Sequence, residues 1–270
     1  MLKLTVLGCY APFPGPGQSC PGYLLEWPAA GPATGARGEA DAGAAAGAPV
    51  RVLLDCGSGS LQRLMGLLKL GDLTAVVLSH LHFDHMADFL VLRYALEIGR
   101  RLGWRQEPLP VFAPPEPAAP FGLLSYRDLT QPVAVTPGQT VKLGPVELTF
   151  FATRHTAPCV ALRASGGGAV FAYTADTEYT PELLDLARDA DLLLSEASLP
   201  DEAPREPGIG HLTAGEAGRL AAEAGARRLV ITHLFPYLDP MHLKRQAEAT
   251  FGRPVEVASD GATFEVGGEA

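Results

Sequence analysis

The sequence predicts an α/β fold, because short apolar runs of strand length recur along the chain between turn and helix signals. Continuous apolar runs of this kind are typical of strands that are buried on both faces of a sheet. The clearest of them cover residues 75–78, 169–173, 192–194 and 229–231. Each is followed closely by a polar, metal-capable side chain, which indicates a functional site at one edge of the sheet.

The first half of the chain is predicted to begin with strands over residues 2–7, 23–26 and 50–54. An amphipathic helix over residues 61–70 follows, and Gly71 closes it. The tract 28–49 consists mainly of Ala, Gly and Pro, so it cannot bury enough apolar surface to become ordered. We expect a flexible loop there.

The second half is predicted to alternate in the same way. A strand is expected around residues 111–112, followed by a loop up to residue 120, and further strands are expected over 146–151, 160–163 and 169–173. A Gly-rich turn at 166–168 joins the last two strands into a hairpin. Asp239 and Pro240 form the start signature of a final helix through Phe251. No linker divides the chain, so residues 1–270 are expected to form a single domain.

The most informative segment is Ser79-His80-Leu81-His82-Phe83-Asp84-His85, which directly follows the apolar run at 75–78. Neutral imidazoles and a carboxylate are ligands that suit zinc, and they are costly to bury without a partner. Because alternate residues of an extended segment point the same way, His80 and His82 can bind one metal ion. Asp84 and His85 come after the chain turns, so they can bind a second ion.

Further metal-capable residues follow other predicted strands. They are His155 after 146–151, Asp176 after 169–173, Glu196 after 192–194 and His233 after 229–231. Open α/β sheets bind their ligands outside the carboxyl ends of the strands, so these side chains are expected to converge. Of the 7 histidines, only His211 and His242 lie outside this set, and His242 is expected on the surface of the last helix.

The motif His80, His82, Asp84 and His85 resembles the HxHxDH signature of the metallo-β-lactamase superfamily, and the resemblance covers nearly the whole chain. It implies a four-layer αβ/βα sandwich with a dinuclear zinc site. By position, the resemblance assigns His80, His82 and His155 to one zinc ion, Asp84, His85 and His233 to the other, and Asp176 to the bridge between them. It gives Asp55 a supporting, non-ligand role. An Asp before a Gly-rich turn also commonly bonds to its own backbone.

Two departures narrow the choice within the superfamily. Di-iron relatives carry Glu where this chain has His82, so zinc is favoured over iron. No Cys follows a strand at a ligand position, which counts against many true β-lactamases. The 4 cysteines lack CxxC spacing and are expected to be reduced thiols. They are Cys9, Cys20, Cys56 and Cys159.

Two further segments resemble ribonuclease Z, a branch of the same superfamily. His211, in the piece 210–217, matches an extra catalytic histidine of that branch, and Glu196 matches its carboxylate partner. Alternatively, His211 serves only the entry to a helix, because Thr213 and Glu216 have the spacing of a capping box. Such a box needs no histidine two positions before it, so we favour the catalytic role.

One departure from ribonuclease Z concerns the substrate. That branch carries a long arm, which clamps transfer RNA, between the positions of His155 and Asp176. Here the predicted hairpin over 160–173 leaves no room for an arm. The chain therefore resembles the arm-less relatives, and the transfer-RNA role is not carried over.

The composition disfavours nucleic acids and membranes as partners. A chain of net charge −9 lacks the broad basic surface that binds phosphate backbones. A helix is expected to begin near Asp84. The arginines at 93, 100, 101 and 105 are expected to form its solvated face rather than an anion site. No signal peptide and no apolar run of membrane-spanning length is found, so a soluble, cytoplasmic protein is expected. A homodimer is left open.

These observations favour a hydrolase of small phosphodiesters, of the cyclic-nucleotide or nucleotide-end type. Two zinc ions would make hydroxide available near neutral pH. Asp84 would orient the nucleophile, and His211, held by Glu196, would protonate the leaving alkoxide. The alternatives are a hydrolase of lactones, thioesters or lactams, a ribonuclease Z-type endonuclease, and a metal-binding regulator without catalysis. The complete ligand set disfavours the regulator, and the natural substrate is left open.

Overall fold

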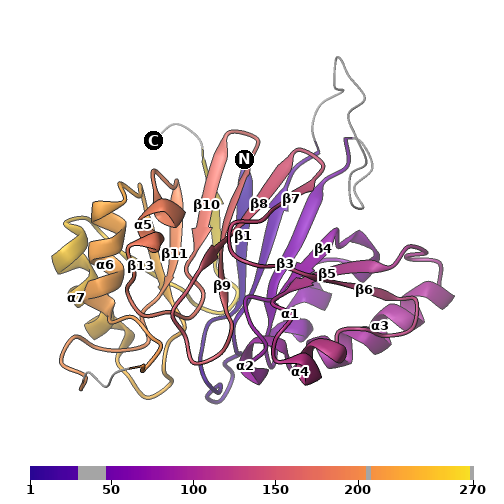
Figure 1. Cartoon of the computed structure of the whole chain (residues 1–270), viewed down its shortest axis with the longest axis horizontal. Helices are drawn as coiled ribbons and strands as arrows, with labels where there is room; N and C mark the ends of the chain where they lie inside the picture. Colours follow the sequence, from indigo (N-terminus) through magenta and orange to yellow (C-terminus); the bar gives the residue numbers. More distant parts are fainter. Residues whose placement is uncertain (30–46, 205–207, 268–270) are drawn as a thin grey trace.

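Two seven-stranded mixed sheets face each other in the middle of the molecule (Figure 1). The computed structural model describes residues 1–29, 47–204 and 208–267, so most of the predicted loop at 28–49 lies outside the described residues. The first sheet has the order β14 (Thr263–Val266), β1 (Leu2–Gly8), β2 (Gly22–Trp27), β3 (Val50–Cys56), β4 (Ala75–Val77), β5 (Leu109–Ala113) and β6 (Thr130–Ala134). The second has the order β13 (Glu256–Val257), β12 (Leu229–Thr232), β11 (Leu192–Glu196), β10 (Ala169–Tyr173), β9 (Val160–Gly166), β8 (Val146–Ala152) and β7 (Thr140–Leu143).

Both faces of each sheet are apolar. Between the sheets, one cluster combines side chains of the first sheet, such as Leu54, with side chains of the second, such as Leu194. The neighbouring residues Leu53 and Leu193 point to the outer faces and pack in clusters with helices. The central strands are therefore buried on both faces, as their continuous apolar runs predict.

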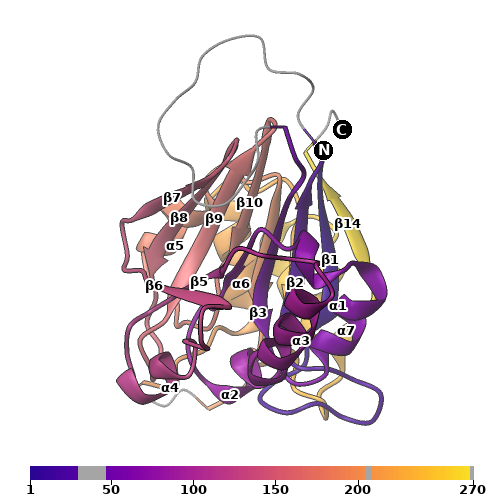
Figure 2. The same ribbon diagram turned by 90° about the vertical axis from the view of Figure 1, so that its right-hand side faces the viewer.

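Helices cover the two outer faces, on the left and right of Figure 1, and Figure 2 shows the right-hand set from the front. The first sheet is covered by α1 (Ser60–Leu67), α2 (Phe83–Met86), α3 (Phe89–Arg101) and α4 (Ala118–Gly122). The second is covered by α5 (Glu182–Ala187), α6 (Ala214–Glu223) and α7 (Pro240–Phe251). This order of helix, sheet, sheet and helix confirms the predicted four-layer αβ/βα sandwich.

The strands that precede the candidate site residues run in one direction within each sheet. β3, β4 and β5 are parallel in the first sheet, and β10, β11 and β12 are parallel in the second. β8 and β10 are both antiparallel to β9, so β8 shares the direction of β10. The carboxyl ends of these strands meet at the lower edge of Figure 1, and the amino terminus lies at the opposite edge.

The segment between the candidate ligands His155 and Asp176 is a plain hairpin. β9 and β10 pair antiparallel, and the turn residues Gly167 and Gly168 have φ angles of 60° and 77°. Two successive positive φ angles match the tight turns that connect twisted strands. The hairpin prediction is confirmed, and this part of the chain contains no inserted arm.

The end of the first helix is predicted wrongly. α1 ends at Leu67, and Gly71 lies in a short 3-10 turn, η1 (Leu70–Asp72). A Cβ at position 71 would lie 2.2 Å from the carbonyl oxygen of Trp104. The glycine is therefore required by the close approach of another segment rather than by a helix end.

Two other boundaries differ from the prediction. The helix expected from Asp84 onward is divided into α2 and α3, because the N–H of Asp88 donates to the Cys56 carbonyl instead of continuing the first helix. The loop expected up to residue 120 contains the start of α4. Pro120 lies in the first turn of α4, where a missing N–H has no helical partner to lose.

The other surface predictions agree with the structure, except at Arg105. Arg93, Arg100 and Arg101 lie on α3, where they contact the Leu123 carbonyl, Asp128 and Glu97, respectively. Arg105 lies beyond the end of α3 and donates to the Leu73 carbonyl, so it does not belong to the solvated face of that helix. His242 is partly exposed and contacts Glu202. The four cysteines are buried, free thiols. Within the described ranges, no helix has the length and apolar character needed to cross a membrane.

Candidate metal centre

Seven side chains from the ends of four strands converge at one edge of the sandwich. They are His80, His82, Asp84, His85, His155, Asp176 and His233. Their segments follow β4, β8, β10 and β12, so both sheets contribute. His80 and His85 are fully buried, and Asp176 and His233 are only 2% and 4% exposed. The structure thus brings together every residue that the sequence proposes as a ligand.

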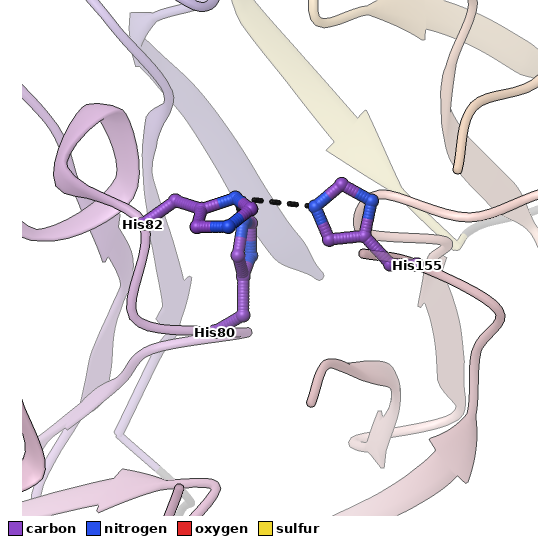
Figure 3. A group of neighbouring side chains, drawn as sticks. All are labelled: His80, His82 and His155. Carbon is purple, nitrogen blue, oxygen red and sulfur yellow. Dashed lines mark hydrogen bonds between the residues drawn. The ribbon is translucent and has the colours of Figure 1, made fainter. Parts of the chain in front are cut away.

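The first group of candidate ligands consists of three imidazoles. His80 Nε2 lies 3.0 Å from His82 Nδ1, and His155 Nε2 lies 3.2 Å from the same atom. Figure 3 shows His80 and His82 on one side and His155 approaching from the other. Three ring nitrogens that face one another in this way are suited to a shared cation.

The second group combines two imidazoles with a carboxylate. His85 Nε2 and His233 Nε2 are 3.2 Å apart, and Asp84 Oδ2 lies 3.6 Å from the first and 3.8 Å from the second. Asp84 and His85 follow β4, and His233 follows β12. A cation here would therefore link the two sheets.

Asp176 lies between the two groups. Its Oδ2 is 3.8 Å from the Nε2 atoms of both His80 and His155, 3.5 Å from His85 Nε2 and 3.0 Å from His233 Nε2. A carboxylate that faces both groups at similar distances has the position required of a bridging ligand.

The outer ring nitrogens of two candidate ligands are fixed by acceptors. His85 Nδ1 donates to the Asp55 carboxylate at 2.9 Å, and His155 Nδ1 donates to the Gly210 carbonyl at 2.9 Å. Because the proton of each neutral ring is on the outer nitrogen, the inner Nε2 keeps its lone pair. Outer partners of this kind orient metal-bound histidines and set their tautomer.

Ser198 fixes the outer ring nitrogen of His233 in the same way, and no sequence pattern predicts it. Its hydroxyl donates to Glu196 Oε2 at 2.5 Å and therefore accepts from His233 Nδ1 at 2.8 Å. This leaves the lone pair of His233 on Nε2, toward the site. A serine two residues beyond a buried strand looks like an ordinary loop residue, so sequence reasoning missed it.

Two further observations indicate that the site suits a metal ion. Asp176 Oδ1 is buried and has no hydrogen-bond partner among the residues that the structure describes. A buried polar oxygen left unpaired costs about 1–3 kcal/mol, which coordination to a cation would offset. Burial also lowers the pKa values of His80, His82 and His155, which favours the neutral form that binds metals.

The electrostatic potential at His85 also favours a bound metal ion. Burial disfavours the charged ring, but the carboxylates of Asp176, Asp55 and Asp84 outweigh it and hold the pKa of His85 well above its ordinary value. A potential that favours a proton on this ring equally favours a metal cation beside it.

Asp55 is a positioning residue whose carboxylate bonds to other segments rather than to the backbone of its own turn. It is fully buried and accepts the Ser79 N–H at 2.7 Å, the Ser79 hydroxyl at 3.0 Å and the Tyr173 hydroxyl at 3.0 Å, in addition to His85. The supporting, non-ligand role implied by the family resemblance agrees with these contacts.

Left-handed backbone occurs at three strand ends of the site. The φ angles are 56° at Asp55, 50° at Ala175 and 57° at His233. Residues other than glycine rarely adopt this conformation, and it turns the chain sharply. At Ala175 the turn directly precedes Asp176, so the strained backbone helps to aim the proposed bridging carboxylate.

His211 lies beside the candidate metal centre and is held by Glu196. Its Nδ1 is 3.2 Å from both carboxylate oxygens of Glu196, which is fully buried and also accepts the Thr177 N–H at 2.6 Å. Burial opposes protonation of His211, but the Glu196 charge outweighs it and raises the pKa to about 9. The capping box of α6 is completed by Thr213 and Glu216 without His211.

A cavity of about 530 Å³ opens over this arrangement. Its polar lining includes His82, Asp84, His155, Asp176, His211 and His233. Its lining also contains apolar side chains, the apolar wall, among them Pro12, Leu199 and Phe235. The candidate ligands and His211 therefore share one space that a small molecule can enter.

Gly57 gives the site its compactness. A Cβ at this position would lie 1.8 Å from the carbonyl oxygen of Asp84 and 2.7 Å from Cys20 Cβ. The backbone after β3 thus approaches the backbone of the ligand segment more closely than any side chain permits. This close approach explains why position 57 is a glycine.

The comparison with known families agrees with this geometry. A family model described as a β-lactamase superfamily domain matches residues 50–234. The chain belongs to the metallo-β-lactamase superfamily. By family it is a metallo-hydrolase, and its clustered His and Asp side chains are of the kind that can hold a metal ion.

Relatives within the metallo-β-lactamase superfamily match over the whole chain. The probable metallo-hydrolase YhfI of Bacillus subtilis is 34% identical over 264 residues, which cover 98% of this chain and 100% of YhfI. The crystal structure of YhfI has a TM-score of 0.85 at 33% identity, covering 97% of this chain and 98% of YhfI. Ribonuclease Z of Mycobacterium bovis is 28% identical over 305 residues, covering 98% of this chain and 99% of that protein. A diphosphatase of the PhnP family shares the fold, with a TM-score of 0.69 at 18% identity and 98% coverage of both chains.

Replacing Ser198 with Ala should weaken metal binding by roughly 10–100-fold, because His233 loses the bond that fixes its tautomer. Competition between the protein and a chromophoric chelator for Zn²⁺ measures this affinity. Ser198→Thr keeps the hydroxyl and should retain most of the affinity. Equal affinity in the Ala variant and the parent protein would contradict the role assigned to this serine.

Proposed function

We propose that the chain is a zinc-dependent phosphodiesterase that hydrolyses small phosphodiesters of the cyclic-nucleotide or nucleotide-end type. The observation that carries the proposal is that His211 lines the cavity of the metal centre and is held there by the buried Glu196. An alkoxide is a poor leaving group and needs a proton as its bond to phosphorus breaks. Hydrolysis of thioesters requires no such pair, because a thiolate leaves without a proton.

Zinc suits the donor set of the site, which contains imidazoles and carboxylates and no thiolate. We assign one ion to His80, His82 and His155, a second to Asp84, His85 and His233, and the bridging position to Asp176. When bound, the two ions would supply a hydroxide nucleophile near neutral pH and offset charge on the phosphoryl oxygens.

The protein groups then have distinct tasks. Glu196 accepts the Nδ1 proton of His211, which leaves Nε2 as the atom that can donate a proton to the leaving oxygen. Asp84, at the cavity wall, would orient the nucleophile opposite that leaving group. The apolar wall would exclude water that competes for the same positions.

A second candidate is a ribonuclease Z-type endonuclease, which the likeness to ribonuclease Z of Mycobacterium bovis favours. Two observations weigh against it. The segment between His155 and Asp176 is a hairpin rather than an arm, and the net charge of −9 opposes binding of a large polyanion.

Protein purified without chelator should contain about two zinc ions per chain, because a complete set of ligands binds metal tightly when the protein folds. Elemental analysis measures the ratio. His233→Ala should lose part of the metal, whereas His242→Ala, which removes an imidazole outside the site, should not. A ratio well below one after zinc reconstitution would rule out the dinuclear assignment.

His211→Ala should lower turnover on the order of 100-fold with unchanged metal content, because the leaving group loses its acid. The loss should be large for alkyl phosphodiesters and small for nitrophenyl phosphodiesters, whose leaving group needs little protonation. Steady-state rates with the two classes measure the difference. An equal loss on both would remove the general-acid role and favour a role of His211 at the entry to α6.

A model phosphodiester should have a larger specificity constant than a precursor transfer RNA at the same ionic strength. The acidic surface repels the polyanion, while the metal centre dominates the field around a small diester. Steady-state kinetics on both substrates, with a lactone as a third, decide among the candidates. A much larger value for the precursor would favour the endonuclease, and turnover of the lactone alone would favour an acyl hydrolase.

A further inference from the structure

The cavity beside the metal centre is lined by two kinds of side chain, and the proposed chemistry uses only the polar kind. The polar lining includes candidate ligands and His211. The apolar wall includes Pro12, Leu199, Ile209 and Phe235. A phosphodiester group is charged, so it cannot be the partner of these apolar side chains. Another part of the substrate has to contact them.

Three aromatic rings extend the apolar wall from the cavity to the surface. Phe235 lines the cavity, and its ring centroid lies 5.7 Å from that of Phe13 and 5.6 Å from that of Tyr237. The ring planes cross at 77° and 73°, so the rings pack edge to face. Phe13 is 43% exposed and Tyr237 is 79% exposed. Large rings that remain accessible beside a cavity are available for contact with a ligand.

The backbone fixes these rings relative to the metal centre. Phe13 and Phe235 belong to different loops, which are joined where the Ala11 N–H donates to the Leu234 carbonyl at 3.0 Å and the Leu234 N–H donates to the Cys9 carbonyl at 2.8 Å. Leu234 directly follows the candidate ligand His233. The distance from the rings to the reacting group is therefore set before a substrate arrives, which lowers the entropic cost of binding.

We infer that Phe235, supported by Phe13 and Tyr237, binds the base of a nucleoside phosphodiester by ring contact. The inference rests on the proposed phosphodiesterase function and adds which part of the diester is recognised. A flat base matches an aromatic wall, and its attached sugar spans the gap to a phosphate at the metal centre. Stacking tolerates any base, because every base has a π-face. The site should therefore prefer a substrate that carries a base over one that carries none, and it should discriminate only slightly among bases.

A matched pair of substrates tests the inference through turnover. Thymidine 5′-(4-nitrophenyl phosphate) and its abasic analogue, in which hydrogen replaces the base, share the sugar, the diester and the leaving group. We expect kcat/KM to be roughly 10-fold higher for the thymidine compound, the size of one base–aromatic contact. Phe235→Ala should lose most of this preference, so that its kcat/KM values for the two compounds become nearly equal.

Two control variants separate ring contact from other causes. Phe235→Leu keeps an apolar side chain without a ring, so it should also lose most of the preference. Tyr94→Ala removes an exposed ring of α3, where Tyr94 is 58% exposed, and should keep the full preference. A preference that persists in Phe235→Ala or in Phe235→Leu would overturn the assignment of the base to this ring.

A binding measurement separates this inference from the proposed function. By calorimetry on zinc-loaded protein, thymidine 5′-monophosphate should bind roughly 10-fold more tightly than 2-deoxyribose 5-phosphate, and Phe235→Ala should remove the difference. Equal affinities in the parent protein would overturn the inference, whichever diesters are hydrolysed. Base-dependent binding without hydrolysis of either diester would support the aromatic subsite and reject the phosphodiesterase function.

Discussion

The arrangement of the whole site depends on one buried carboxylate, Asp55. An ionised carboxylate in the interior costs several kcal/mol unless donors surround it, and here four donors do so. Ser79 and His85 follow β4 in the first sheet, while Tyr173 belongs to β10 in the second. Satisfying this one charge therefore holds the carboxyl ends of both sheets together and aims the His85 ring inward.

A second carboxylate, Glu196, connects the two chemical tasks that we assign to the cavity. It bonds directly to His211, the proposed acid, and through the Ser198 hydroxyl to His233, a candidate ligand. A change in the hydrogen bonding of one of these histidines therefore affects the other through their shared acceptor. The polar side chains of the cavity form one hydrogen-bonded network. The residues of the apolar wall belong to loops, so their identity can differ with the substrate without disturbing that network.

The sequence predicts the central strands and the convergence of the candidate ligands well, because both follow from local patterns: apolar runs, and polar residues just beyond them. Edge strands such as β7 and β13 are not predicted, since they are short and partly exposed. Gly71, Gly57 and Ser198 also lie beyond such reasoning. Their roles depend on contacts with segments distant in sequence, which no local pattern contains.

The left-handed backbone at Ala175 and His233 would make the lifetime of this protein depend on its metal supply. Conformations of this kind cost about 1–3 kcal/mol each and persist only where the surroundings compensate for them. A metal ion that binds only the folded arrangement shifts the folding equilibrium toward it by mass action. When the ion is scarce, more of the chain unfolds and is degraded by proteases. The amount of enzyme in a cell would then follow metal availability without any dedicated regulator.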